Sequence, residues 1–562
     1  MVSSFAGLPL VACSVIKGGN KELALMTQSV QDVSVPLNPD ASGDDGAARR
    51  AASNAEIEIK LLAEPDQLAE IDRSGIVAHY LQGEGETLDL RAIYYDTADM
   101  DLQKAGLVLR VRTDGERFVM TLKSKREGNG KALERTEWKR PVLSIEPDLA
   151  ALASCLPADV AATLEKNPLT ALFSTEVRRQ TRLLHTPQGI VELAMDRGRI
   201  IAGERSQDIC EVELELMEGS TEALFQLAQE LLSAFHLRPS IRSKSARGFD
   251  LAGDAPPPVS KAQDMAVGAG ATLDQALDEI FRSALQHLLE NQPAAEDGRD
   301  PAGIHQYRVA LRRLRSILGL IRPLFSSSQQ LDLFRADAKW LMSSLNDARD
   351  WDVFVTETLP SMVRACPSVE GFDDLGAAAQ KQREAAHERA REAIRDPRTA
   401  QFQIALGLWV EQKRWRGDAS SDQLELLSGP VHSFARNVMK RLRRKVLRRG
   451  RHFSDLTPDE SHELRIAIKK LRYVSGFFLP LLGTDKDHRR YIKLLSTLQD
   501  QLGHKNDMAV VERLVQPLTT DKAPRTAHRA AGAMLGWQAA RLNQRDPDLE
   551  ANWKDFLETD IS

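Results

Sequence analysis

Hydrophobic and polar residues alternate strictly in several short stretches of the first 220 residues. The first of these stretches is Glu56-Ile57-Glu58-Ile59-Lys60. Successive side chains of a strand point to opposite faces, so Glu56, Glu58 and Lys60 share one face and the isoleucines share the other. The stretch predicts a strand with one apolar and one charged face.

The same alternation returns four times, and each time the charges on the polar face have one sign. The stretches are 107–112 with Arg110 and Arg112, 120–125 with Lys123 and Lys125, 191–196 with Glu192 and Asp196, and 211–216 with Glu211, Glu213 and Glu215. Exposed charge pairs add little stability, so a solvated sheet has no need to sort its charges. A barrel with a polar interior would need its charges sorted by strand, because carboxylates hold divalent cations while arginines and lysines hold a polyanion.

Two stretches between these strands show helical periodicity. One runs from Asp66 to about His79, directly after Pro65, and the other runs from Ser220 to Phe235. Both are apolar on one side. We expect two amphipathic helices that cover the outside of the barrel.

From Ala271 onward the alternation disappears, and the chain repeats itself with a helical period. Segments 305–315 and 462–472 each have His at i and cations at i+3, i+7, i+8 and i+10. Later pairs keep the same order: 345–347 with Asp350 and Asp352 matches 498–500 with Asn506 and Asp507, and the helix of Trp409 matches that of Trp537. This pattern predicts an internal duplication of a helical unit.

Positions i, i+3, i+7 and i+10 form one stripe on a helix. The stripes are His305, Arg308, Arg312 and Arg315 in the first repeat and His462, Arg465, Lys469 and Arg472 in the second. A third basic helix is expected from Arg436 to Arg451, and it includes Arg441 and Arg444. A duplicated register of cations favours a polyanion-binding surface over three solvated helices. The two histidines could instead be metal ligands, but their neighbours are arginines and not acids or cysteines.

Length and composition agree with a multidomain globular protein. The chain has 562 residues, 42% hydrophobic and 28% charged, with a net charge of −5. It contains no run of about 18 apolar residues, so we expect no membrane span. Its four cysteines lie far apart, which favours a reducing cytoplasm over a disulfide framework or a zinc site. Residues 1–54 show no sustained period and are expected to be disordered.

The first 250 residues resemble the CYTH domain, the family of triphosphate tunnel metalloenzymes. The resemblance rests on 56–60, which has the form E-x-E-x-K, and on the later blocks 92–97, 109–112, 172–175, 209–216 and 243–248. One such block is a weak pattern, but the set in this order is specific. The second half resembles the CHAD domain, a helical fold named for its conserved histidines and associated with inorganic polyphosphate. Its second repeat departs from the first, with Lys469-Lys470 in place of an arginine pair.

These resemblances imply an N-terminal α+β domain built on an antiparallel β-barrel tunnel, followed by an all-α, duplicated helical-bundle domain. We expect residues 55–252 to form the CYTH domain and 271–562 the CHAD domain. Residues 253–270, with Pro256-Pro257-Pro258, would be the linker.

The CYTH resemblance also implies hydrolysis of inorganic triphosphate to pyrophosphate and phosphate with Mg²⁺ or Mn²⁺. The implied metal ligands are Glu56, Glu58, Glu213, Glu215 and Asp196, with Glu192 as a further ligand or water-orienting base. The implied catalytic residues are Glu56, Glu58, Lys60 and Lys123, and the implied substrate-binding residues are Arg110, Arg112, Arg135, Arg179, Lys244 and Arg247. The alternation of side chains along a strand does not settle whether Arg178 or Arg179 points inward. Arg179 is chosen because it aligns with the family's arginine.

The CHAD resemblance implies polyphosphate binding by the two stripes together with Arg441 and Arg444. The expected location is the cytoplasm, with polyphosphate granules as a place of association. Two other functions stay open, namely an inactive polyphosphate-binding scaffold and a CYTH enzyme that acts on thiamine triphosphate or ATP. Nucleic-acid binding is less favoured, because stacking on bases needs aromatic side chains and these make up only 5% of the chain.

Overall fold

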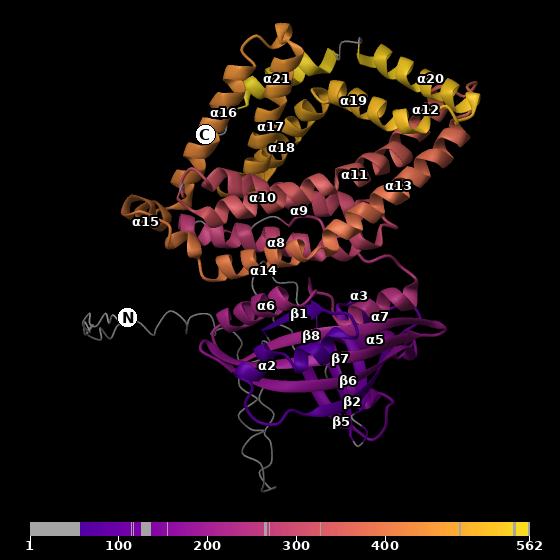
Figure 1. Cartoon of the computed structure of the whole chain (residues 1–562), viewed down its shortest axis with the longest axis vertical. Helices are drawn as coiled ribbons and strands as arrows, with labels where there is room; N and C mark the ends of the chain where they lie inside the picture. Colours follow the sequence, from indigo (N-terminus) through magenta and orange to yellow (C-terminus); the bar gives the residue numbers. More distant parts are fainter. Residues whose placement is uncertain are drawn as a thin grey trace, which may run out of the picture. The chain divides into compact units, whose positions relative to one another are not determined.

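The computed structural model describes residues 57–113, 115, 117–124, 137–153, 156–263, 267–268, 270–325, 327–482, 485–542 and 547–559. A sheet with short helices occupies the chain up to residue 253, and helices alone follow (Figure 1). The predicted disordered segment, 1–54, lies outside the described residues. In the described part of the chain, no helix is both long and apolar enough to cross a membrane.

In the described part of the chain, the sheet has nine strands in the order β5-β4-β3-β2-β6-β7-β8-β1-β9, and every neighbouring pair is antiparallel. The strands are β1 (Glu58–Leu62), β2 (Thr87–Asp96), β3 (Leu107–Thr113), β4 (Phe118–Ser124), β5 (Glu137–Val142), β6 (Thr170–Thr186), β7 (Gly189–Ala202), β8 (Arg205–Gly219) and β9 (Arg238–Ser240). The long strands β6, β7 and β8 lie at the centre, and β1 is inserted between β8 and β9. This order brings the first charged stretch of the chain next to the last one.

The predicted closed barrel is not confirmed. The edge strands β5 and β9 are not paired with each other among the described residues. Each edge strand contains a proline, Pro141 in β5 and Pro239 in β9. Proline has no backbone N–H to donate to a neighbouring strand, and it is typical of strands that end a sheet.

Among the described residues, seven helices accompany the sheet. They are α1 (Gln67–Asp72), α2 (Gly75–Tyr80), α3 (Asp101–Lys104), α4 (Leu149–Ala153), α5 (Ala158–Leu164), α6 (Glu222–Ala234) and α7 (Lys244–Gly253). The second predicted amphipathic helix is α6, whose Leu224, Leu227 and Leu231 are buried in one core with strands β1, β7 and β8. The first predicted helix is broken in two, because Ser74 caps a new helix by accepting a hydrogen bond from the Val77 amide at 3.2 Å.

Helix α7 lies against the face of the sheet that carries the sorted charges. Its Gly248 sits on the Phe173 ring of β6, where a Cβ atom would come within 2.0 Å of a ring carbon. Phe173 also stacks on Tyr94 of β2, with ring centroids 4.5 Å apart. The small residue therefore lets the helix approach the sheet closely, and it places the first turn of α7 beside the charged strands.

From residue 273 onward, the described residues are mainly helical. The helices are α8 (Leu273–Asp297), α9 (Pro301–Ile321), α10 (Gln329–Ser344), α11 (Asn346–Val353), α12 (Leu359–Ala365), α13 (Phe372–Arg395), α14 (Pro397–Glu411), α15 (Ser421–Ser428), α16 (Val431–Arg449), α17 (Pro458–Phe478), α18 (Asp485–Gln501), α19 (His504–Val515), α20 (Arg525–Leu542) and α21 (Pro547–Glu558), with a π-helical turn at Phe354–Thr358. Short 3₁₀ turns lie at Arg414–Arg416, Phe453–Asp455, Leu479–Leu481 and Gln516–Leu518.

The two predicted repeats form α9 and α17, which are alike in construction. Each spans 21 residues and begins with a proline that follows a capping side chain, Asp300 in one helix and Thr457 in the other. The third basic helix is α16. All three helices bury their apolar sides in one large core, and this leaves their basic stripes for other contacts.

Candidate functional site

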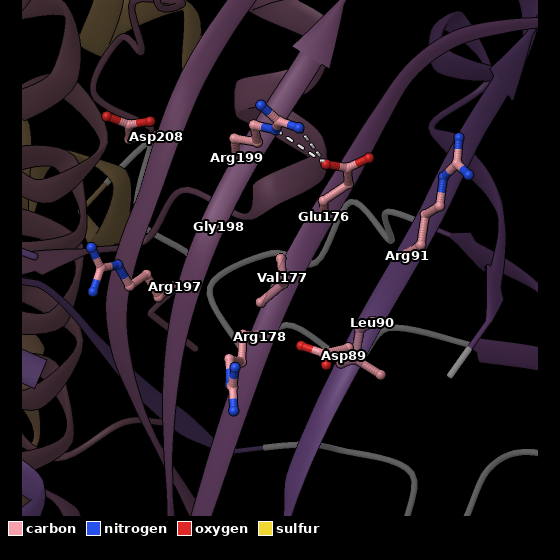
Figure 2. Close-up of a pocket in the computed structure, with 10 residues that line it drawn as sticks. All are labelled: Asp89, Leu90, Arg91, Glu176, Val177, Arg178, Arg197, Gly198, Arg199 and Asp208. Carbon is pink, nitrogen blue, oxygen red and sulfur yellow. Dashed lines mark hydrogen bonds and ion pairs between the residues drawn. The ribbon is translucent and has the colours of Figure 1, made fainter. Parts of the chain in front are cut away.

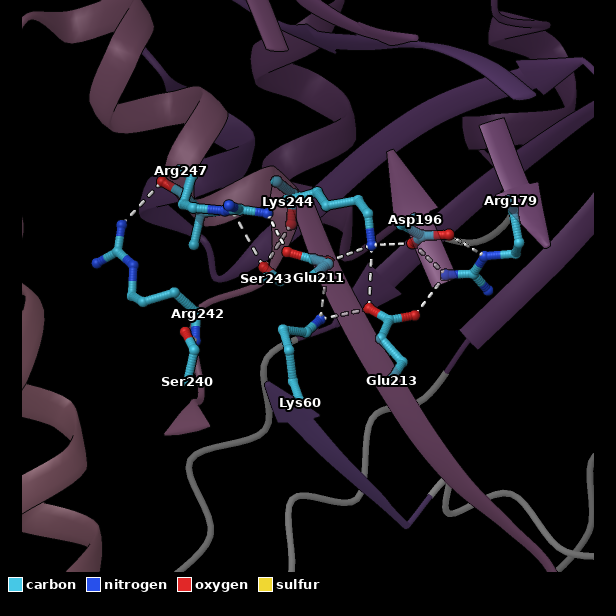
Figure 3. Close-up of polar contacts among 12 residues, drawn as sticks. Lys60, Arg179, Asp196, Glu211, Glu213, Ser240, Arg242, Ser243, Lys244 and Arg247 are labelled. Atoms are coloured by element: carbon cyan, nitrogen blue, oxygen red, sulfur yellow. Dashed lines mark hydrogen bonds and ion pairs between the residues drawn. The ribbon is translucent and has the colours of Figure 1, made fainter. Parts of the chain in front are cut away.

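The strand register gathers the charged residues of distant stretches on one face of the sheet, called here the polar face. Three rows of directly paired residues cross strands β1, β6, β7 and β8. They are Arg179–Asp196–Glu211, Ala194–Glu213–Lys60 and Glu192–Glu215–Glu58. Figure 3 shows the cluster that the first two rows form with the start of α7.

Asp196 and Glu213 are held by cations on two sides. Arg179 makes a bidentate pair with Asp196, with both N–O distances at 2.7 Å, and the same guanidinium also contacts Glu213. From the other side, the Lys244 ammonium lies 2.5 Å from Asp196 and 3.0 Å from Glu213. Lys60 contacts Glu213 at 2.5 Å. The Asp196 side chain is fully buried, so these ion pairs replace its hydration.

Glu211 completes the cluster, and the expected site residues did not include it. Its side chain is fully buried and contacts Lys244 and Arg247 of α7, with Lys60 3.6 Å away. Asp196, Glu211 and Glu213 offer oxygen atoms within 4.8 Å of one another. The sequence contained the signal, because Glu211 has the same strand parity as Glu213 and Glu215.

Four cations therefore surround three carboxylates, which leaves an excess of one positive charge. Burial alone would raise the pKa of Glu213, but Lys244, Lys60 and Arg179 hold it well below its usual value. Burial alone would lower the pKa of Lys244, but Glu211, Asp196 and Glu213 raise it. The pKa of Arg179 is raised against burial in the same way, by Asp196 and Glu213. Glu213, Lys244 and Arg179 are therefore charged at neutral pH. The excess of positive charge in the cluster suits an anion.

The third row has a different character, because it joins three carboxylates side by side. Glu192, Glu215 and Glu58 come from neighbouring strands and are directly paired. Like charges directly opposite each other destabilise a sheet. Carboxylate oxygens are ligands that a divalent cation prefers, and a bound cation would offset the like charges of this row. Glu56 precedes this row on the same predicted strand, but it lies outside the described residues.

Three further predicted residues lie on the polar face, on β3 and β4. The pairing of β2 with β3 sets Arg112 opposite Ala92 and Arg110 opposite Tyr94, and the pairing of β3 with β4 sets Lys123 opposite Val108. Ala92 of β2 is paired with Thr175 of β6. Thr175 and Arg179 are four residues apart on one strand, so their side chains point to the same face of the sheet. Arg135 lies outside the described residues.

The structure separates Arg178 from Arg179. Arg179 reaches into the cluster on the polar face, whereas Arg178 lines a shallow hollow of about 510 Å³ on the opposite face (Figure 2). The same hollow contains the ion pair of Arg199 and Glu176, at 2.9 Å, with both side chains partly exposed. The two adjacent arginines of β6 thus serve opposite faces of the sheet.

A second group of cations lies on α9 and α17. The charges of Arg308, Arg312, Arg315 and Arg465 act on Lys469, so the stripes of the two repeats face a common region. The charges of Lys445 and Arg441 of α16 and of Arg335 of α10 likewise act on Lys470. This connected set, together with Arg472, whose charge acts on Arg312, is called here the basic track. Arg335 and Arg349, which acts on His305, belong to it although the sequence did not indicate them.

Burial and the charges of neighbouring cations lower the pKa values of His305, Arg308 and Lys469 in the basic track. Burial, then the charges of Arg349, Arg312 and Arg308, lowers the pKa of His305 to about 4, so this histidine is neutral at pH 7. Burial, then Arg312 and other cations, lowers the pKa of Arg308 to about 10. Burial, then Arg312, Arg465, Arg308 and Arg315, lowers the pKa of Lys469 to about 8. An anion would relieve this repulsion.

The cations of α16 divide between two roles. Arg441 and Arg444 are exposed, and Arg441 acts on Lys470 of the track. Arg443 instead donates hydrogen bonds to the Leu557 and Thr559 carbonyls at the end of α21, at 3.1 and 2.9 Å. Arg449 pairs with Glu463 at 2.8 Å. Part of this helix's charge pattern therefore serves the fold.

Comparison with known proteins identifies both halves of the chain. Residues 54–249 match the CYTH domain, and residues 279–516 match the CHAD domain. The chain therefore carries a CYTH domain followed by a CHAD domain. Further matches concern individual proteins.

An inorganic triphosphatase of Haemophilus influenzae is 33% identical over 199 residues, which cover 34% of this chain and 54% of that protein. The chain thus spans about half the length of this relative. An uncharacterized protein of Mycobacterium tuberculosis is 23% identical over 480 residues, or 79% of this chain and 85% of that protein. The crystal structure of the CHAD domain from the plant Ricinus communis is 31% identical, covers 54% of this chain and 98% of its own, and gives a TM-score of 0.47.

Proposed function

We propose that the CYTH domain hydrolyses inorganic triphosphate to pyrophosphate and phosphate on the polar face. The observation that carries the proposal is the division of this face into an anion-holding cluster and an adjoining row of carboxylates. Hydrolysis of a phosphoanhydride needs little covalent chemistry from the protein. It needs positioning and neutralisation of charge on the phosphates.

We assign the metal to the carboxylate row. Glu58 and Glu215, together with Glu56, would hold Mg²⁺ or Mn²⁺, since both ions prefer oxygen ligands. When bound, such an ion neutralises phosphate oxygens and polarises the anhydride. Asp196 and Glu213 are engaged by cations, so we give them the role of holding those cations in place.

The remaining residues bind and orient the substrate. Lys60, Arg179, Lys244 and Arg247 would exchange part of their contact with the carboxylates for contact with phosphate oxygens, and Arg110, Arg112 and Lys123 would extend the binding surface along β3 and β4. Glu192 lies beside Glu215 and is only half buried. It is the carboxylate best placed to orient the attacking water and take its proton.

The curated relative supports this assignment. The inorganic triphosphatase of Haemophilus influenzae matches this chain over a stretch of 199 residues at 33% identity. A cluster that binds phosphates through cations alone needs no contact with an organic group. We therefore rank inorganic triphosphate above thiamine triphosphate and ATP as the substrate.

The CHAD domain is proposed to bind inorganic polyphosphate along the basic track. The track carries cations from both repeats whose mutual repulsion an extended polyanion would relieve. The neutral His305 would contribute as an uncharged hydrogen-bonding group. The proposed location is the cytoplasm, with polyphosphate granules as a site of association.

The affinity for polyphosphate is expected to fall by about tenfold between pH 7 and pH 9. With a pKa of about 8, Lys469 is charged below that pH and mostly neutral at pH 9, so the track loses a cation as the pH rises. Titration with long-chain polyphosphate at both pH values and constant ionic strength measures the effect. The Lys469→Arg variant, which stays charged, should lose most of this pH dependence. An equally steep decline in that variant would assign the titration to another group.

Release of phosphate from inorganic triphosphate by the purified chain with Mg²⁺ or Mn²⁺ tests the catalytic proposal. Turnover that depends on the metal supports it. A protein that binds polyphosphate but releases no phosphate from any triphosphate would be a scaffold.

A further inference from the structure

Three arginines of the basic track donate hydrogen bonds to neutral groups. Two others pair with carboxylates, Arg335 with Asp332 and Arg349 with Glu357. Arg308 donates to the side-chain oxygen of Asn346 at 2.5 Å, and Arg472 donates to that of Gln499 at 3.1 Å. Arg465 donates to the main-chain carbonyl of Gln499 at 3.2 Å. Asn346 and Gln499 occupy equivalent places in the two repeats, within Leu345-Asn346-Asp347 and Leu498-Gln499-Asp500. The duplication therefore extends from the cations to the amides that hold them.

An aromatic ring joins the two repeats. The ring of Tyr473 on α17 lies 4.7 Å from the guanidinium carbon of Arg472 and 5.9 Å from that of Arg312 on α9. A ring face attracts a guanidinium without cancelling its charge. The Tyr473 hydroxyl is buried and has no hydrogen-bond partner among the described residues. One tyrosine thus steadies an arginine from each repeat.

Other arginines of the helical half have carboxylate partners. Arg322 pairs with Asp332 at 2.6 Å, and Arg383 pairs with Asp352 at 2.7 Å. Near the track, Asp347 and Asp350 pair with Arg513 of α19. The Asp350 charge also acts on Arg308. The groups that contact Arg308, Arg472 and Arg312 directly are nevertheless neutral, namely amides, a main-chain carbonyl and a ring.

We propose that Asn346, Gln499 and Tyr473 are positioning residues of the polyphosphate site, which fix the arginines of both repeats while leaving their charge for the polyanion. An amide supplies the same hydrogen-bond acceptor as a carboxylate but no negative charge. Partners of this kind reduce the side-chain entropy lost on binding without competing with phosphate. This inference rests on the proposed binding of polyphosphate.

The test is the double variant Asn346→Asp with Gln499→Glu, which keeps the shape and the acceptors and adds two charges. Binding of long-chain polyphosphate should weaken by about tenfold or more, and the slope of log affinity against log salt should fall by about one for each cation neutralised. The thermal midpoint should stay unchanged or rise, because two new ion pairs form and the new carboxylate at position 346 would stand at the start of α11. Loss of binding without loss of stability is the predicted signature.

Three further variants separate positioning from a purely structural role. Asn346→Ala removes the hydrogen bond without adding charge, so it should lose less affinity than Asn346→Asp. Tyr473→Phe should bind nearly as the wild type, while Tyr473→Leu should weaken binding by about fivefold to tenfold. Gln412→Glu is the matched control, because Gln412 accepts a hydrogen bond from Arg414, which is not part of the track. Its affinity should not change.

The inference would be overturned if the double variant and Tyr473→Leu both bound long-chain polyphosphate with the affinity of the wild type and with the same slope of log affinity against log salt. Equal losses in Asn346→Ala and Asn346→Asp would also overturn it, because charge would then have no part in the effect. The wild-type titration separates these results from failure of the proposed function. Absence of binding by the wild type itself would remove the polyphosphate site and this inference together.

Discussion

Replacing Glu213 with alanine is expected to lower triphosphate turnover by about 100-fold or more. Glu213 contacts Lys60, Arg179 and Lys244, so it sets the spacing of three cations at once. Misplacement of such groups by about 1 Å can cost two orders of magnitude in rate. Removal of one partner from a buried ion pair also costs stability, roughly 3–5 kcal/mol. Phosphate release and thermal unfolding measure the two effects.

Two comparisons keep this prediction specific. Glu213→Gln keeps the side-chain shape, so a folded Glu213→Gln protein with low turnover separates loss of charge from loss of fold. Glu176→Ala removes a carboxylate from the neighbourhood of Arg199 on the opposite, exposed face, and it should change turnover by less than about twofold because exposed pairs contribute little. Both Glu213 variants should bind polyphosphate as the wild type does. Wild-type turnover in Glu213→Gln would rule out the assigned role.

Reversing the charge of Arg312 and Lys469 together is expected to weaken polyphosphate binding by about 100-fold. The change places two negative charges where cations from both repeats meet, and it removes two contacts with phosphate. The Arg312→Glu, Lys469→Glu protein should turn over triphosphate at close to the wild-type rate. Binding titrations and phosphate release on the same preparation provide both readouts.

A control with the same change in net charge isolates the track from long-range electrostatics. Arg414→Glu with Lys381→Glu reverses two exposed cations of the helical half that do not belong to the track. This control should lose much less affinity for polyphosphate than the track variant. For each variant, the loss of affinity relative to the wild type should become smaller at high salt, because salt screens the added charges. Loss of triphosphate turnover in the track variant would show that the CHAD domain takes part in catalysis.

Strand periodicity alone predicted which residues share the polar face. Side chains alternate between the two faces of a strand, so recognising a strand decides which residues point to each face. The residues predicted to share the polar face do so, namely Glu58, Lys60, Arg110, Arg112, Glu213 and Glu215. The sequence could not indicate which strands become neighbours. Insertion of β1 between β8 and β9 depends on packing across the whole domain. That insertion brings Lys60 to Glu213.

The parts that the sequence did not reveal depend on contacts between distant elements. Glu211 has the right parity, but its partners Lys244 and Arg247 come from a helix that Gly248 seats on the sheet. Closure of the barrel was expected from the charge pattern, whereas prolines in β5 and β9 make both of them edge strands. The break between α1 and α2 follows from a single capping serine.

The helical half shows the same limit. The repeated stripe predicted a basic surface made twice, and the repeated Asn346 and Gln499 segments were visible as part of the duplication. Their role was not, because a hydrogen bond from Arg308 to Asn346 joins residues 38 positions apart. Sequence periodicity locates the charges, and tertiary contacts decide which of them are neutralised.

The most direct test of the central proposal is release of phosphate by the purified full chain from inorganic triphosphate, thiamine triphosphate, ATP and long-chain polyphosphate, each with Mg²⁺, with Mn²⁺ and after chelation. Efficient, metal-dependent release from inorganic triphosphate, with much slower release from the organic triphosphates, is the predicted result. Preference for thiamine triphosphate or ATP, or no release from any of the four, would contradict it.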